Sequence, residues 1–571
     1  MSRFLKFAVE QSVEGRGGDL KETVLGVEVF DRETCYDSRA DPVVRVEARR
    51  LRDKLREYYE SEGVEDAVII ELPKGGYAPA FRSRLPAGRA AVRWRAFALV
   101  AAAACFVGLI YELRFAAPGR SGQQSDLASV AVLPFIDLSP SKDQGYFCDG
   151  LTEELIHALT KIEGLRVPAR TSVFQLRGAD LREIARQLHV GTVLEGSLRK
   201  DGNRLRVTAQ LVRISDNSHL WSETYDREAG AVFSIQDDIS RAIVDKLRVQ
   251  LAGGANRPLV KSSTENSEAY NLYLRGRDAL NRFTPDAANR SAGFFQQTID
   301  KDGNYAQAYA GLADSYSEIA FFGTLAPRVA YPKAIQAAMK ALQLDENLAE
   351  AHVALATPKM AYEWDWAMAE REYKRALALN PNDANARRQY GIQLMYQGRF
   401  REAIAEMRRS LDLDPLSART SRELSTVFFH ARVYDQAIEQ GRKTLDLDPN
   451  YVRAYHTLGR AYLQKGMYTE AIAALTKWPD VGTGFLGYAY AVSGRRTEAM
   501  EIIEKQKEKG RSESVAMIYA GLGDKDRAFE WLEKAYKDHL YLLTLKVNPE
   551  SDPLRSDPRF DALLRRIGLA N

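Results

Sequence analysis

The chain has 571 residues, which is too long for one hydrophobic core and predicts three or four domains. Its hydrophobic content of 45% and charged content of 27% are those of a folded globular protein. The formal net charge of +3 excludes a global affinity for polyanions, so any nucleic-acid site must be a local basic surface. The spacing of the three cysteines suggests neither a disulfide framework nor a zinc site.

The first 90 residues predict two short helices, a long third helix and a β-hairpin. The third helix opens at Asp41-Pro42, where Asp caps the helix and Pro occupies its first turn. Pro73-Lys74-Gly75-Gly76 is a hairpin turn between two short apolar strands. The expected helices cover residues 3–14, 20–30 and 42–62, and the expected strands cover residues 67–72 and 77–82.

The third helix carries an apolar line and, beside it, a basic line. A helix with these two faces, followed by a hairpin with a basic tip, suits DNA: the helix enters the major groove and the hairpin reaches a phosphate. The slightly acidic balance of residues 1–90 favours the alternative, a solvated basic face on a partner-binding domain. The candidate DNA-binding residues are Arg45, Arg49, Arg50, Arg52, Arg56 and Lys74.

Val-Arg-Val-Glu-Ala-Arg-Arg-Leu-Arg-Asp-Lys-Leu at residues 44–55, followed by Lys-Gly-Gly-Tyr at residues 74–77, resembles the recognition helix and wing of OmpR/PhoB-type regulators. The resemblance implies a winged-helix-like α+β domain over residues 1–90 that binds DNA, and by family analogy a homodimer on DNA. The chain departs from that family because no small sheet precedes its first helix.

A stretch of sixteen uncharged, mostly apolar residues follows at positions 96–111. With Arg95 reaching toward lipid headgroups, it predicts one transmembrane helix over residues 94–113. Arginines are denser before the stretch than after it, which predicts a bacterial inner-membrane protein with a cytoplasmic N-terminus and periplasmic C-terminal domains. A buried alanine-rich helix or an interfacial helix is the alternative.

After a linker at residues 114–127, residues 128–252 alternate strands and helices and predict a compact α/β domain. Val-Ala-Val-Leu-Pro-Phe at residues 130–135 and Val-Leu-Glu-Gly-Ser-Leu-Arg at residues 193–199 resemble the TolB N-terminal-like domain. This resemblance implies a module that binds a ligand or a protein. The expected strands are residues 129–135, 165–174, 193–198, 205–214 and 219–225, and the expected helices are residues 149–162, 180–188 and 235–251.

The acidic residues Asp149, Glu153 and Glu154 raise the question of a metal site in that domain. Acids are favoured in the first turn of a helix, so we expect these three to serve a helix N-terminus and not a metal ion.

Pro381, Pro415 and Pro449 recur at one constant interval, and small residues recur in step with them at Gly391, Ser425 and Gly459. This 34-residue period of two amphipathic helices is typical of a repeat array. Residues 267–571 resemble tetratricopeptide repeats, which implies an all-α superhelix with a groove for a partner peptide. Tyr362, Trp364 and Trp366 either pack between helices or line that groove as partner-binding residues.

The sequence contains no phosphate-binding loop, zinc-protease motif, catalytic triad order or kinase motif. We therefore expect no enzyme activity, catalytic residue, metal ion or cofactor. The combined fold class is multidomain: a winged-helix-like domain, a transmembrane helix, a TolB-like α/β domain and a tetratricopeptide solenoid.

The arrangement resembles ToxR/CadC-type membrane-tethered regulators, in which DNA binds inside the cell and protein partners bind outside. A non-catalytic membrane scaffold that assembles complexes through its repeats is the alternative, and an enzyme that recruits substrates through them is a third class.

Overall fold

The computed structural model describes residues 2–83, apart from residues 14–19, 31, 33–40, 61–62, 64–65, 67 and 74–75. It also describes residues 129–570, apart from residues 163, 229–231, 248–263 and 479–482. The chain divides into two compact units, Met1–Pro118 and Gly119–Asn571.

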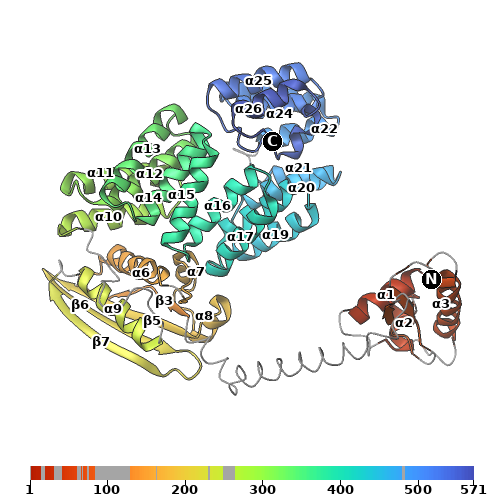
Figure 1. Ribbon diagram of the computed structural model, residues 1–571, viewed down its shortest axis with the longest axis horizontal. Coiled ribbons are helices and arrows are strands. Elements are labelled where there is room, and N and C mark those ends of the chain that lie inside the picture. The colour runs from red at the N-terminus through yellow and green to blue at the C-terminus, as the bar shows by residue number, and fades with distance from the viewer. Residues whose placement is uncertain are drawn as a thin grey trace, which may run out of the picture. The chain divides into compact units, whose positions relative to one another are not determined.

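The first unit contains the three helices and the hairpin that the sequence predicts (Figure 1). Phe4 and Ala8 of the first helix are fully buried and pack in one core with Ala48 and Leu51 of the third. The apolar line of the third helix therefore faces the core and leaves its arginines on the outside. The elements are α1 (Ser2–Val13), α2 (Glu22–Glu28), α3 (Val43–Glu60) and the antiparallel strands β1 (Val68–Glu71) and β2 (Ala80–Ser83).

The expected fold class is wrong in one respect, because it included a transmembrane helix. Within the part of the chain that the structure describes, no helix combines the length and the apolar character needed to cross a bilayer. Residues 94–113, where that helix was expected, lie outside the described residues. The inner-membrane localisation and the membrane-bound arrangement rested on this helix and are withdrawn with it.

The second unit begins with an α/β domain built on a five-stranded sheet in the order β3-β5-β6-β7, with β4 paired to β5. β3 and β4 run parallel to β5, and β5, β6 and β7 are antiparallel. The strands are β3 (Val130–Val132), β4 (Ile136–Asp137), β5 (Thr192–Asp201), β6 (Arg204–Arg213) and β7 (His219–Glu228), and the helices are α6 (Gly145–Thr160), α7 (Arg170–Gln175), α8 (Leu181–Leu188) and α9 (Val232–Leu247).

Helices α6 and α9 cover one face of this sheet, and α7 and α8 cover the other face at the parallel end. The strand expected over residues 165–174 is wrong. Only Arg166 forms a bridge, to Ser129, and the chain then enters α7. The cause is tertiary, because Ala169 donates its backbone N–H to Leu413 of the repeats and not to a neighbouring strand.

The repeat array consists of eight consecutive antiparallel helix pairs among the described residues, closed by a 3-10 turn and a last helix (Figure 1). The pairs are α10 (Ser267–Leu280) with α11 (Pro285–Lys301), α12 (Ala306–Phe322) with α13 (Pro327–Leu344), α14 (Ala349–Pro358) with α15 (Trp366–Leu379), α16 (Ala384–Tyr396) with α17 (Phe400–Leu413), α18 (Ala418–His430) with α19 (Tyr434–Leu447), α20 (Ala454–Gln464) with α21 (Tyr468–Leu475), α22 (Thr483–Val492) with α23 (Arg496–Glu508), and α24 (Ser512–Gly521) with α25 (Lys525–Lys537). The final elements are the 3-10 helix η4 (Pro549–Leu554) and α26 (Pro558–Arg566), and a π-helical turn, η3 (Lys359–Glu363), follows α14.

Small residues let the two helices of each pair approach. A Cβ placed on Gly459 would lie 2.6 Å from Cγ of Leu475, and one on Gly391 would lie 3.1 Å from Cε of Met407. The polar turns between pairs supply the caps: the side chains of Asp383 and Ser417 accept hydrogen bonds at the N-termini of α16 and α18.

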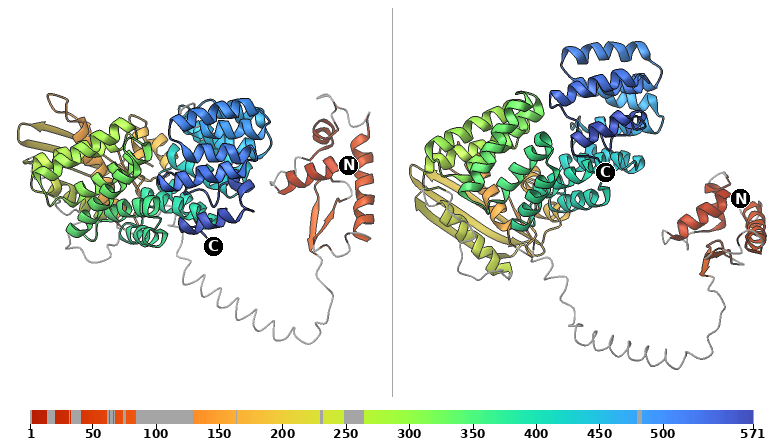
Figure 2. Two further views of the ribbon diagram at one scale, coloured as in Figure 1. Left: turned by 90° about the horizontal axis from the view of Figure 1, so that it is seen from above. Right: turned by 45° about the horizontal axis from the view of Figure 1, so that its top comes forward.

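The turns that recur once in every repeat also hold the α/β domain against the array, and both views in Figure 2 show the two lying side by side. Asn380 donates its side-chain amide to the hydroxyl of Thr160, at 3.1 Å. Asp414 accepts two hydrogen bonds from Ser172. The α/β domain and the repeats consequently share continuous contacts, and one hydrophobic cluster runs from the sheet into the helices α10 and α12.

Candidate functional site

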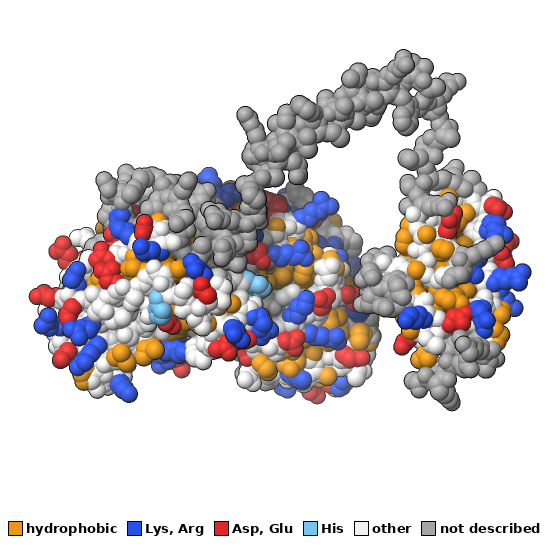
Figure 3. Space-filling model, turned by 90° about the horizontal axis from the view of Figure 1, so that it is seen from below, with side chains coloured by type: hydrophobic (Ala, Val, Ile, Leu, Met, Phe, Trp, Pro, Cys, Tyr) orange, Lys and Arg blue, Asp and Glu red, His pale blue; other side chains and the backbone are white. Residues whose placement is uncertain are grey.

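The basic face of α3 is one candidate site. Arg45, Arg49, Arg50 and Arg56 are all exposed, and Lys and Arg side chains with acidic ones among them line the α3 side of this unit in the space-filling view (Figure 3). Three of the four have acidic neighbours: Arg45 lies 3.3 Å from Glu22, Arg50 lies 2.6 Å from Glu47, and Arg56 lies 3.7 Å from Asp53. Such exposed pairs contribute little to stability, so their arginines can turn to a phosphate at small cost.

Arg52 differs from the other arginines of α3. Its guanidinium donates to the backbone carbonyls of Leu72, at 3.0 Å, and of Pro73 and Gly76, each at 3.1 Å. The side chain is half-buried and ties the hairpin turn to the helix. Arg52 therefore positions the hairpin, while Arg49 keeps its charge on the outer face. Lys74, expected at the tip of the hairpin, lies outside the described residues.

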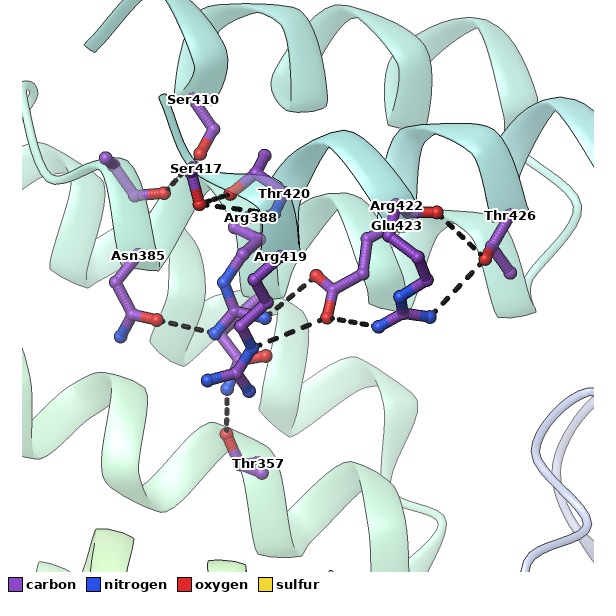
Figure 4. A network of polar contacts seen from close by, with 12 residues as sticks. Thr357, Asn385, Arg388, Ser410, Ser417, Arg419, Thr420, Arg422, Glu423 and Thr426 are labelled. Carbon is purple, nitrogen blue, oxygen red and sulfur yellow. Dashed lines mark hydrogen bonds and ion pairs between the residues drawn. The ribbon is translucent and has the colours of Figure 1, made fainter. Parts of the chain in front are cut away.

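A second candidate site lies on the inner helices of the repeats, where arginines occupy equivalent positions of successive units (Figure 4). Arg388 and Arg422 lie one repeat apart on α16 and α18. Arg419 and Arg453 are also one repeat apart, on α18 and just before α20. We call these four residues the arginine rows.

Glu423 is the carboxylate that the arginine rows share. Its oxygens accept hydrogen bonds from Arg388 and Arg422, each at 2.9 Å, and lie 3.6 Å from Nε of Arg419. The surrounding guanidiniums hold the pKa of Glu423 at about 2, although burial alone would raise it. Glu423 is therefore ionised at neutral pH and offsets one of the four positive charges.

Two further acids face the rows from α12, and burial weakens their charge. Burial raises the pKa of both Asp314 and Glu318 to about 7. One carboxylate oxygen of Glu318 is buried without a hydrogen-bond partner. Burial, and after it the nearby charge of Arg388, lowers the pKa of Arg419 to about 10.

Sequence reasoning did not find the arginine rows, although the signal was present. The 34-residue period that identified Gly391, Ser425 and Gly459 also relates Arg388 to Arg422 and Arg419 to Arg453. The prolines and the small residues were compared between repeats, but the charged residues at equivalent positions were not.

The three aromatic residues proposed as partner-binding are engaged by the end of the same chain. The ring of Trp364 stacks on Tyr536 and His539, and Tyr362 packs on His539. The indole N–H of Trp366 donates to the backbone carbonyl of Ile567, at 2.8 Å. These residues therefore form the packing between helices that the sequence left open as the alternative.

The acidic residues of α6 do not cap that helix, which begins earlier than expected, at Gly145. Glu153 is buried and accepts hydrogen bonds from Arg277 and Asn281 of the first repeat. Asp149 lies 2.6 Å from Arg177. Among the residues that the structure describes, no group of three or more acidic, His or Cys side chains is arranged to hold a metal ion.

Comparison with protein families assigns a class to both parts of the second unit. Residues 125–242 match the second domain of HilA/YgeH-like transcriptional regulators, and residues 391–452, 428–484 and 514–537 match tetratricopeptide repeats. The chain thus carries a HilA/YgeH-like regulator domain joined to tetratricopeptide repeats. These matches name neither the OmpR/PhoB winged helix nor the TolB domain, so both resemblances stay predictions.

Individual relatives match parts of this chain. The transcriptional regulator HilA of Salmonella typhimurium is 26% identical over 227 residues, which are 39% of this chain and 40% of HilA. "Putative adenylate cyclase 3" of Rhizobium meliloti (strain 1021) is 39% identical over 187 residues, 32% of each chain. The matched parts thus span less than half of each relative.

Solved structures align with parts of the chain. PilF of Pseudomonas aeruginosa is 24% identical, with 36% of this chain and 92% of that chain covered and a TM-score of 0.29. A human IFIT1 dimer is 16% identical, with 53% of this chain and 78% of that chain covered and a TM-score of 0.36.

Proposed function

We propose that the protein is a transcriptional regulator that binds DNA through α3 and a protein partner through its repeats. The observation that carries the DNA part is the exposed arginine face of α3, backed by a hairpin that Arg52 holds in place. A helix of this kind reads base edges while the hairpin contacts the backbone. The similarity to HilA over the second domain supports the regulatory role.

The proposal assigns no catalytic role to the chain. The similarity to the cyclase relative covers 32% of that protein, which is too small a part to carry its activity to this chain. The repeats supply the partner-binding part, because stacked helix pairs present an extended concave surface to another protein.

Selection of bound sequences from randomised duplexes with the full-length chain, followed by gel-shift titration, tests the DNA part. Arg49→Ala should weaken binding and reduce the slope of log K against log salt by about 1, because one phosphate contact is lost. Lys6→Ala is the matched control, since Lys6 is an exposed cation on α1 with 76% of its side chain accessible.

Two outcomes would contradict the proposal: no duplex retained at low salt, or the same loss for Lys6→Ala as for Arg49→Ala. The first would leave the partner-binding alternative for the N-terminal unit.

A further inference from the structure

The arginine rows carry more positive charge than the three acids that face them neutralise. Three of the four arginines in these rows, Arg388, Arg419 and Arg422, lie around the ionised carboxylate of Glu423. The pKa values of Asp314 and Glu318 are raised to about 7, so each carboxyl group is only partly ionised at neutral pH and adds only partial negative charge. An excess of cations on a concave surface favours an anionic occupant.

Arg453 is the arginine of these rows whose charge is least compensated. It forms no ion pair with any carboxylate among the described residues, and its guanidinium carbon lies within 6 Å of four aromatic ring centroids. The distance to Phe283 is 5.1 Å, and on Phe283 the guanidinium of Arg419 also packs, at 3.8 Å. These ring contacts hold the two guanidiniums in place, and their N–H groups can donate to a carboxylate.

The site has two walls that come from distant parts of the array. Phe283, Phe321 and Phe322 belong to the first and second helix pairs, whereas Arg419 and Arg453 belong to the fifth and sixth. Arg419 keeps 34% of its side chain accessible and Phe321 is 55% exposed, so the site is open to solvent. It thus combines cationic edges with apolar rings at one accessible place.

Two other arginines on the same helices already bind carboxylates from the C-terminal part of the chain. Arg460, two helical turns along α20 from Arg453, donates to both carboxylate oxygens of Glu550, at 2.8 Å each, and to the side chain of Asn548. Arg432, just after α18, makes a bidentate pair with Asp552 at 2.7 Å. Glu550 and Asp552 belong to the 3-10 helix η4, and the turns just before it bury Leu542, Leu543 and Leu545.

We propose that Arg419 and Arg453 form a subsite for an acidic segment of a partner protein, whose carboxylates bind the guanidinium N–H groups while its apolar side chains pack on the phenylalanines. This inference rests on the proposed protein-binding role of the repeats and names the class of partner. Arg388 and Arg422 stay paired with Glu423 and position it, so that Arg419 is held beside the subsite.

The test uses the full-length chain and a fluorescein-labelled hexaglutamate peptide as probe, with hexaglutamine as the uncharged control, in anisotropy titrations at low salt. We expect hexaglutamate to bind and hexaglutamine not to bind. Arg419→Ala with Arg453→Ala should weaken binding at least tenfold, whereas Arg409→Ala, which removes an exposed charge from the outer helix α17, should change it less than twofold. Arg419→Lys with Arg453→Lys should restore only part of the affinity, because Lys cannot form a bidentate pair.

Equal losses in the Arg409→Ala control, or no binding of hexaglutamate, would overturn the proposal. Complete displacement of the peptide by millimolar inorganic phosphate would also overturn it, in favour of a small-anion site. Circular dichroism of each variant establishes that it is folded. DNA retention measured on the same variants keeps the two questions separate, since a failed subsite with intact DNA binding leaves the regulator function standing.

Discussion

The hydroxyl and the backbone N–H of Ser172 both donate to the same carboxylate oxygen of Asp414, at 2.6 and 3.0 Å, although the two residues lie 242 positions apart. Burial raises the pKa of Asp414, and the hydrogen bonds from Ser172 favour its ionised form. The same hydroxyl accepts the N–H of Leu416. The α/β domain is therefore joined to the array by a specific, buried polar contact.

Replacing Asp414 with Ala should destabilise the second unit by about 1–3 kcal/mol, because the buried donors of Ser172 lose their acceptor. Asp448→Ala is a matched control: Asp448 occupies the equivalent turn of the next repeat and accepts only a local backbone hydrogen bond from Asn450 in the contacts described. Urea unfolding followed by tryptophan fluorescence measures both. Equal losses of unfolding free energy in the two variants would show that the contact between Asp414 and Ser172 adds no stability beyond that of an ordinary turn.

Gly459→Ala should destabilise the array by about 1–3 kcal/mol, because the added Cβ would lie 2.6 Å from a side-chain carbon of Leu475 and overpack the helix pair. Gly293→Ala should have the opposite sign and stabilise by about 0.5–1 kcal/mol. Gly293 lies inside α11 with no atom within 4 Å of the new Cβ, so only helix propensity changes. Thermal denaturation measures the stability of both variants. A loss of stability in both would contradict the packing role of Gly459.

Replacing Arg52 should loosen the hairpin, whereas replacing Arg49 should not. Arg52→Ala removes three hydrogen bonds to the hairpin turn and should speed hydrogen exchange in β1 and β2. Arg49→Ala should leave exchange there unchanged, since Arg49 is exposed. Faster exchange in both variants would mean that the helix itself, and not the contact with the turn, supports the hairpin.

Glu318 should make stability depend on pH in a definite direction. Its pKa is about 7 in the folded chain against an ordinary value of 4.5, so between these values the unfolded chain ionises Glu318 while the folded chain does not. Stability from this residue is therefore highest below pH 4.5 and falls until about pH 7, by at most about 3 kcal/mol. Glu318→Gln should remove this loss of stability, so the variant should become more stable relative to the wild type as the pH rises from 4.5 to 7.

Urea unfolding at pH 4.5, 6 and 8 measures that difference, with the exposed Glu508→Gln as control. A constant offset between Glu318→Gln and the wild type at all three pH values would contradict the raised pKa.

The sequence predicted local structure better than contacts between distant residues. The 34-residue period correctly placed the central helix pairs, because a repeat's packing is fixed by residues within it and its neighbours. It could not predict that Ala169 would donate to Leu413, so the apolar stretch after Leu165 was taken for a strand. The transmembrane helix was also wrong, since no helix among the described residues is long and apolar enough to cross a bilayer.

For the candidate sites too, the sequence predicted what depends on local spacing and missed what depends on distant partners. The helical spacing of the arginines on α3 placed Arg49 on an exposed face, but it could not distinguish Arg52, whose partners are backbone carbonyls twenty or more residues away. Trp366 was left undecided between packing and partner binding because its partner, Ile567, lies 201 residues further along the chain.

The hydrogen bond from Trp366 to Ile567 has a consequence for evolution of the array. Open solenoids gain and lose repeats easily, since each unit touches only its neighbours. Here the last helix is anchored on the third pair, so an extra unit inserted between them would pull that anchor out of register. We therefore expect an added repeat to be better tolerated outside the stretch from Trp366 to Ile567 than within it.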